Sequence, residues 1–348
     1  MTAFRILILS LVVFWSCSTP KQSGISLPED GEFFDLLSEY NVFDDLVPNE
    51  KLTKYEVTNS LFTDYAEKDR YVYIPDGQSA TLKKDGFFDW PVGSMMVKNF
   101  YYTVDQIDTE KIIETRLLIK DETEWKAISY VWNDQQTEAK ISKVGAVFPL
   151  TIDHKTEKLA FDYVVPNKNQ CKSCHNKNEK IDPIGFKYGN LDTDISVDSK
   201  SVNQLAYLAD KGIIKLNVFQ DSINSMISYN DAGQDIQERA LAYLDINCGH
   251  CHRPDGPGNT SGLFLQYDET RSNHLGFCKS PVAAGKGSGG RIFDIYPGHA
   301  DSSILYYRMA SVDPGSMMPE VGRSLTHKEG LSIVAEWINA LEYDCFAQ

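Results

Sequence analysis

The sequence has few basic residues and, after residue 16, no long hydrophobic run. Lysine and arginine number 34 against 49 aspartates and glutamates, so the formal net charge is −15. Because so acidic a surface repels phosphate backbones, the composition argues against nucleic-acid binding. No stretch after residue 16 approaches eighteen uninterrupted apolar residues, so no transmembrane helix is expected there. Aromatic residues make up 11% of the chain, which is enough for sizeable cores and excludes a disordered or low-complexity chain.

Residues 1–16 have the pattern of a signal peptide. Arg5 supplies the positive start, and the apolar stretch 6–15 is too short to span a bilayer. A serine and Cys17 follow directly and resemble a bacterial lipobox, so we expect cleavage before Cys17, lipid on its thiol and a polar tether over 17–30. Secretion without lipid is the alternative, because the residues before Cys17 are bulkier than the usual pattern. In either case we expect the protein on the periplasmic side of a bacterial membrane, in the first case anchored to that membrane by lipid.

Four of the seven cysteines stand in two identical C-x-x-C-H patterns, Cys171-Lys-Ser-Cys174-His175 and Cys248-Gly-His-Cys251-His252. This is the attachment pattern of c-type haem. Cysteines three residues apart lie on one helical turn, where both sulfurs reach the vinyl groups of one porphyrin, and the next histidine becomes the proximal iron ligand. The sequence therefore predicts two covalently bound haem c groups, with His175 and His252 as axial ligands.

A zinc site and a thioredoxin-type redox motif are the two other uses of such cysteines. A zinc site built from two C-x-x-C pairs leaves both histidines unexplained. A thioredoxin-type motif normally occurs once and leaves them unexplained as well. His250 lies between the cysteines of the second motif and is expected to face solvent. Two cysteines remain in this exported chain, so Cys278 and Cys345 are a candidate disulfide.

The sequence predicts an α+β multidomain protein, and residues 235–348 are expected to form an all-α class I cytochrome c-like domain. A helix over 235–247 leads into Cys248, and a closing helix is expected to begin at a capping box, Thr326 to Glu329. Met318, followed by proline and placed just before the closing helix, is the expected distal ligand of the second haem, in preference to Met317 and Met309. The alternative is that all three are core methionines.

Residues 31–168 are expected to form an antiparallel β domain that ends at the first haem motif. After a helix-like start over 33–45, apolar residues alternate with others around 100–104, 113–119 and 159–165. The segment 169–234 is too short for a cytochrome c domain of its own, so the first haem is expected to pack against the β domain. Four candidates for its distal ligand remain open, and none has a distinctive position: Met95, Met96, His154 and Met226.

Several stretches resemble a family of uncharacterised dihaem c-type cytochromes: Leu61–Arg70, Trp90–Tyr102, Glu114–Ile119, Tyr130–Ala139, Val165–His175, Ala242–His252, Pro281–Gly290 and Met317–Arg323. The resemblance covers nearly the whole mature chain and implies two covalent haems without an established substrate. From Ser261 to Ile338 the chain is also similar to cytochrome c domains of large planctomycete-type proteins. The β domain that ends in C-x-x-C-H resembles the cytochrome c-prime-beta group, whose haem sits on a sheet.

These features favour an electron-transfer protein or the electron-entry subunit of an oxidoreductase, with redox proteins as partners. No catalytic acid–base set is visible in the sequence, so no catalytic residue is predicted. The alternatives are a haem enzyme of the dihaem peroxidase type and a gas- or ligand-binding module that uses an open first haem.

Overall fold

The computed structural model describes residues 24–29, 32–104 and 109–346. The expected signal peptide, Cys17 and most of the expected tether over 17–30 lie outside the described residues. Among the helices that the structure describes, none is long and apolar enough to cross a bilayer.

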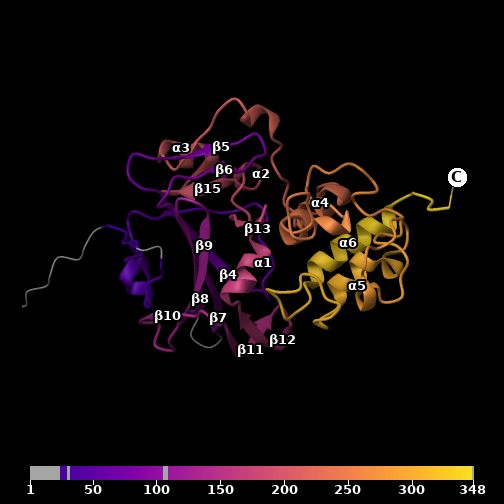
Figure 1. Ribbon diagram of the computed structural model, residues 1–348, viewed down its shortest axis with the longest axis horizontal. Helices are drawn as coiled ribbons and strands as arrows, with labels where there is room; N and C mark the ends of the chain where they lie inside the picture. Colours follow the sequence, from indigo (N-terminus) through magenta and orange to yellow (C-terminus); the bar gives the residue numbers. More distant parts are fainter. Residues whose placement is uncertain (1–23, 30–31, 105–108, 347–348) are drawn as a thin grey trace, which may run out of the picture.

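A six-stranded antiparallel sheet forms the centre of the N-terminal part (Figure 1). Its strands have the order β10-β9-β8-β7-β4-β3 and span Thr53–Lys54 (β3), Glu67–Tyr73 (β4), Met95–Val104 (β7), Thr109–Lys120 (β8), Trp125–Trp132 (β9) and Ala139–Ile141 (β10). Successive side chains of a strand point to opposite faces. In β7, Met95 and Val97 therefore pack into the apolar cluster under the N-terminal segment, whereas Met96 and Lys98 face a cavity on the other side.

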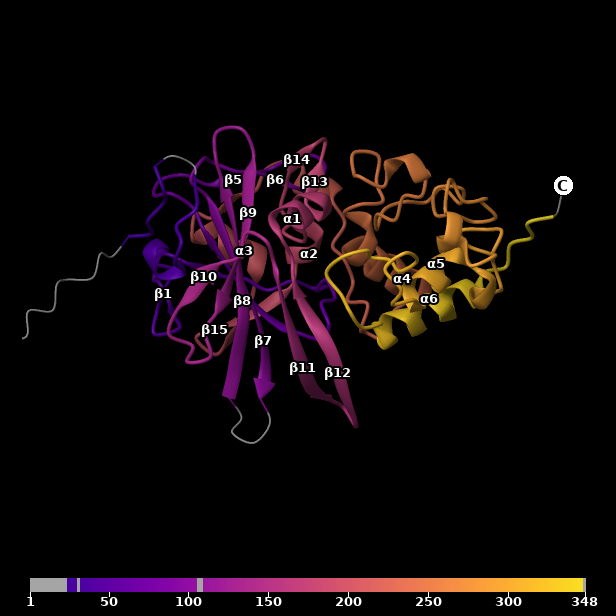
Figure 2. The same cartoon turned by 60° about the horizontal axis from the view of Figure 1, so that its bottom comes forward.

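Smaller elements surround this sheet. A hairpin joins β11 (Ala146–His154) to β12 (Glu157–Val165), and it lies between the sheet and the C-terminal helices (Figure 2). A second, three-stranded sheet has the order β17-β5-β6. The remaining elements of this part are short: β1 (Phe43–Asp44), β2 (Val47–Pro48), β5 (Ala80–Leu82), β6 (Phe88–Asp89), β13 (Asn176–Lys177), β14 (Lys180–Ile181), β15 (Asp194–Val197), β16 (Lys200–Asn203), β17 (Ile214–Lys215), α2 (Tyr188–Leu191) and α3 (Gln204–Asp210).

The helix that carries the first haem motif is α1 (Lys168–Cys174), which follows β12 almost directly. Asn167 and Gln170 form a reciprocal capping box: each backbone N–H donates to the other residue's side-chain oxygen, both at 2.9 Å. Cys171 belongs to the same apolar cluster as Trp125 and Ala127 of β9. The first motif thus packs against one face of the large sheet.

The prediction of an all-α class I cytochrome c-like domain over 235–348 is wrong. The protein is β-rich overall, 27% strand against 22% helix. The described part of this range, residues 235–346, holds three α-helices: α4 (Ile236–Leu244), α5 (Ile304–Ala310) and α6 (Lys328–Ala340). A π-helical turn, Asp245–Gly249, extends α4. Most of the remainder is turns and loops, because glycine and proline recur through it, as in Gly256-Pro257-Gly258, and interrupt helical periodicity.

Two local predictions also need correction. His327, not Thr326, precedes α6, and no side chain caps that helix. The Thr326 hydroxyl donates to the Ala310 carbonyl instead, at 3.2 Å, and Glu329 bonds the hydroxyl of Tyr65 at 3.0 Å. The helix expected over 33–45 is only a 3-10 turn, Leu37–Tyr40. In both places tertiary contacts take groups that a local motif would use, and over 33–45 the Asp35 carbonyl accepts from the N–H of Ile141 at 2.9 Å.

α4 and α6 pack against each other through one apolar cluster. The buried faces of the two helices contribute Ala240, Tyr243, Leu244, Ile333, Val334, Trp337 and Ile338. Beyond the end of α6, a disulfide joins Cys345 to Cys278, with the Cα atoms 5.3 Å apart and a sequence separation of 67. It ties the chain after α6 to the loop that precedes Pro281.

Replacing both Cys278 and Cys345 by serine should lower the free energy of unfolding by about 4 kcal/mol, because the bridge restricts a long loop in the unfolded chain. Urea denaturation of the variant and the parent measures this difference. Thiol labelling of denatured, unreduced protein, followed by peptide mapping, is the control. Labels on both residues 278 and 345 would contradict the pairing.

Candidate functional site

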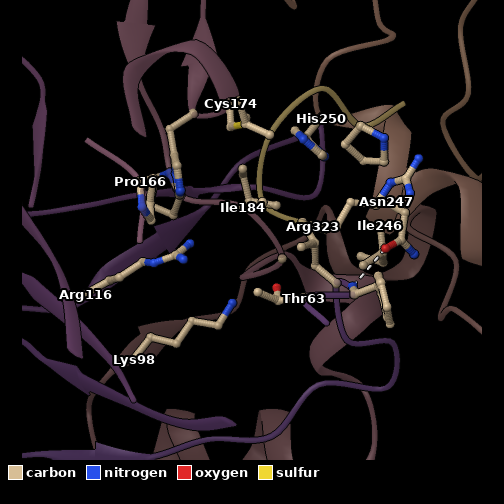
Figure 3. Close-up of a pocket in the computed structure, with 18 of the residues that line it drawn as sticks. Thr63, Lys98, Arg116, Pro166, Cys174, Ile184, Ile246, Asn247, His250 and Arg323 are labelled. Carbon is tan, nitrogen blue, oxygen red and sulfur yellow. Dashed lines mark hydrogen bonds between the residues drawn. The ribbon is translucent and has the colours of Figure 1, made fainter. Parts of the chain in front are cut away.

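A cavity lies between the large sheet and the C-terminal helices, and both haem motifs reach it (Figure 3). It encloses about 1560 Å³ of space, part of which is open to solvent. One wall comes from β4, β7, β8 and β9, and a second from α1. The third wall comes from the end of α4 and the segment 318–323. Most of the lining is apolar, which is typical of sites for cofactors and small molecules.

The residues of the first motif fit a covalently attached haem. Cys171, Cys174 and His175 all line the cavity, and both thiols are free. Nδ1 of His175 lies 2.9 Å from the Asp182 carbonyl. A hydrogen bond from Nδ1–H to that oxygen leaves Nε2 as the free ligand atom. Burial lowers the pKa of His175 to about 4, so the ring is neutral at neutral pH, the form that coordinates iron.

The second motif lies next to the first. The N–H of Asn178, three residues after His175, donates to the carbonyl of Asp255, three residues after His252, at 2.9 Å. Burial raises the pKa of Cys251 to about 12, and the charge of Cys174 adds to this rise. Two segments that are far apart in sequence therefore bring their cysteines close together.

Only part of the second motif lines the cavity. Cys248 does, and so do Met318 and Met309. Cys251 and His252 lie outside the lining, and Nδ1 of His252 is 3.4 Å from the Ser261 hydroxyl. Burial lowers the pKa of His252, which favours the neutral ring. The structure places Met318 at the cavity, and His252 as its axial partner stays a prediction.

The expectation that His250 faces solvent is wrong. Its ring lines the cavity, and its Nδ1 is buried without a partner in hydrogen-bond geometry among the described residues, although the Ile246 carbonyl faces it. Burial lowers the pKa of His250 to about 3, and the charge of His175 adds to this effect. Where the first motif packs against the second, this side chain is half-buried and its Nδ1 fully so, which neither motif alone shows.

Of the four candidates for the distal ligand of the first haem, only Met96 lines the cavity. Met95 points to the opposite face of the sheet, as alternation along β7 requires. His154 stacks on the ring of Tyr65 with 3.8 Å between ring centroids, and Met226 packs among the C-terminal apolar residues.

Sequence reasoning missed a group of cations on the sheet wall, formed by Arg70, Lys98 and Arg116. Burial lowers the pKa of Lys98 well below its usual value, and the charges of Arg70 and Lys68 lower it further. Burial alone would lower the pKa of the Arg116 guanidinium, but the neighbouring Glu114 carboxylate has the larger effect and raises it. The signal in the sequence is Lys98 itself, which alternates with Met96 and Phe100 on the inward face of a strand.

Hydrogen bonds that Asp64 accepts and Arg323 donates fix the third wall. The Asp64 carboxylate accepts from the backbone N–H groups of Ser324, at 2.8 Å, and Leu325, at 2.7 Å. Arg323 donates to four carbonyls of the surrounding loop, among them that of Met318 at 2.9 Å. Asp64 belongs to the N-terminal part, so this contact holds the Met318 segment against the sheet unit.

Comparison with models of protein families, with curated proteins and with solved structures finds no match to this chain. Within the described residues, no group of three or more histidine, cysteine, aspartate or glutamate side chains is arranged to hold a metal ion.

Two substitutions of Asp64 should destabilise the protein to different degrees, because they remove different numbers of hydrogen-bond acceptors from the third wall. Asp64→Asn keeps one acceptor oxygen and should lower the free energy of unfolding by about 1–2 kcal/mol. Asp64→Ala leaves both N–H groups without a partner and places alanine at a positive φ of 48°, so we expect about 3 kcal/mol. Urea denaturation measures both values, with Asp210→Ala at the exposed end of α3 as the control. Equal, small losses for all three variants would contradict this role.

Proposed function

We propose that this protein is an exported electron-transfer protein that carries two covalent haem c groups, one on each C-x-x-C-H motif. The observation that carries the proposal is that the two motifs, distant in sequence, meet beside one largely apolar cavity. When bound, a haem supplies reversible one-electron chemistry. Two such centres in adjacent positions form a short path for electrons. In this proposal Cys17 carries a lipid anchor, and the partners are redox proteins on the periplasmic side of the membrane.

The chain itself does three things in this proposal. Cys171 and Cys174 hold the first haem through α1, whose position is set by its packing on β9. The Asp182 carbonyl orients His175 through Nδ1. The sheet wall brings positive charge close to His175, since the charges of Lys98 and Arg116 both depress the pKa of that ring. Positive charge near a redox centre stabilises an added electron.

Met318 is the proposed distal ligand of the second haem, and Met309 is the matched control because both line the cavity. Met318→Ala should abolish the near-infrared band of methionine bound to ferric iron. It should also lower the reduction potential of one haem, because methionine ligation raises that potential. Met309→Ala should leave the band in place. Optical spectra and a potentiometric titration of both variants measure these effects.

Two outcomes would count against these assignments. A band that survives in Met318→Ala and disappears in Met309→Ala would move the ligand to Met309. Sustained turnover of hydrogen peroxide by the haem-loaded protein would contradict electron transfer as its function and favour an enzyme.

A further inference from the structure

Arg70, Lys98 and Arg116, together called the cationic wall below, form a single row across three strands. Arg70 of β4 is the direct cross-strand partner of Lys98 of β7, and Lys98 is the direct partner of Arg116 of β8. All three line the cavity. Like charges directly opposite each other on neighbouring strands destabilise a sheet. Burial away from water makes the repulsion stronger.

Within the ranges that the structure describes, one carboxylate makes hydrogen bonds with the cationic wall. Glu114 is fully buried and binds Arg116 through two hydrogen bonds, at 2.5 and 3.0 Å. Among the described residues, Arg70 donates to neutral groups only, the Ser60 hydroxyl at 2.6 Å and the Lys68 carbonyl at 3.4 Å. The wall therefore carries more positive charge than its own hydrogen-bond partners neutralise.

Lys98 is the least satisfied member. In the part of the chain that the structure describes, its ammonium makes no hydrogen bond or ion pair, and it lies over the ring of Phe100, 5.0 Å from the centroid. Arg116 lies over the same ring, with Cζ 4.2 Å from the centroid. Figure 3 shows the Lys98 and Arg116 side chains extending from the sheet into the cavity.

We propose that the cationic wall is a binding site for a small oxyanion. A protein with a net charge of −15 that gathers three basic side chains in one row, with Arg70 buried and Lys98 and Arg116 half-buried, presents a local basic site in an otherwise acidic molecule. Guanidinium and ammonium groups bind oxyanions through short, charge-assisted hydrogen bonds. A bound anion would relieve the repulsion within the row and supply Lys98 with an acceptor.

The carboxylates of a haem have the same chemistry and are the competing occupant. Arg116, however, is the direct cross-strand partner of Ser129 in β9, the strand on which α1 packs with Cys171. The sulfurs of Cys171 and Cys174 attach to the vinyl side of the porphyrin, and the two carboxylates of haem lie at the opposite edge. The wall therefore faces the thioether side and favours a free anion. This one step rests on the proposed haem attachment.

Calorimetric titration of the haem-loaded full chain tests the site, with sodium sulfate and sodium nitrate as probes and ionic strength held with sodium chloride. We expect saturable binding of one anion per chain. Lys98→Met should weaken it by about tenfold or more, the loss expected for one charge-assisted hydrogen bond. Lys98→Arg should keep most of the affinity. Lys140→Met, on exposed β10 of the same sheet, should bind like the parent.

A second measurement distinguishes a loss of anion binding from a loss of folded protein. In buffer without oxyanions, Lys98→Met should unfold at a higher temperature than the parent, because the substitution removes a half-buried basic side chain that lies opposite two guanidinium groups. Added sulfate should stabilise the variant less than the parent. Parent protein without saturable binding, or Lys98→Met that binds as tightly as the parent, overturns the proposal. The proposal is also overturned if the parent binds no anion and Lys98→Met shifts the reduction potential of one haem. That result would assign the wall to the haem carboxylates. The haem absorbance of each sample is recorded in parallel, so that sulfate binding by a chain without haem would refute the proposed function alone.

Discussion

The contact between the Asp64 carboxylate and the backbone of Ser324 and Leu325 determines how the two halves of this protein meet. Asp64 lies beside the large sheet, and Ser324 and Leu325 lie between Met318 and α6. The carboxylate satisfies two N–H groups at once. Asp64 itself is 2% exposed, and this burial raises the pKa of its carboxyl group. The hydroxyl of Tyr102 in β7 binds the Asp64 carbonyl at 3.0 Å and fixes the same residue to the sheet.

The arrangement of the cavity follows from this contact. The sheet turns one face to its own N-terminal core and the other to α1, the cavity and the C-terminal part. Protein interiors are otherwise close-packed, and polar links at the border of this cavity join the two halves. Asn247 provides another such link, since its side-chain oxygen accepts from the N–H of Phe62 at 2.8 Å. The same border brings the two haem motifs together and leaves the cationic wall facing them.

Local patterns predicted the parts of this structure that depend on near neighbours. Alternation located the strands around 100–104, 113–119 and 159–165, and helical periodicity located α4 and α6. The long connection between those two helices is rich in glycine and proline, and its turns give no periodic signal. The prediction of an all-α domain was wrong for that reason. The burial of His250 and the row of Arg70, Lys98 and Arg116 depend on contacts between segments and on strand register. A single sequence shows neither.

The proposed function depends on covalent haem on both motifs. The most direct measurement is the intact mass of the full chain after export from cells that mature c-type cytochromes, recorded after extraction with acidified acetone. We expect the mass of the processed chain plus two haem groups. One haem should remain when Cys171 and Cys174 are replaced by alanine, and one when Cys248 and Cys251 are replaced. A mass equal to the bare chain, or to the chain with zinc, would contradict the account.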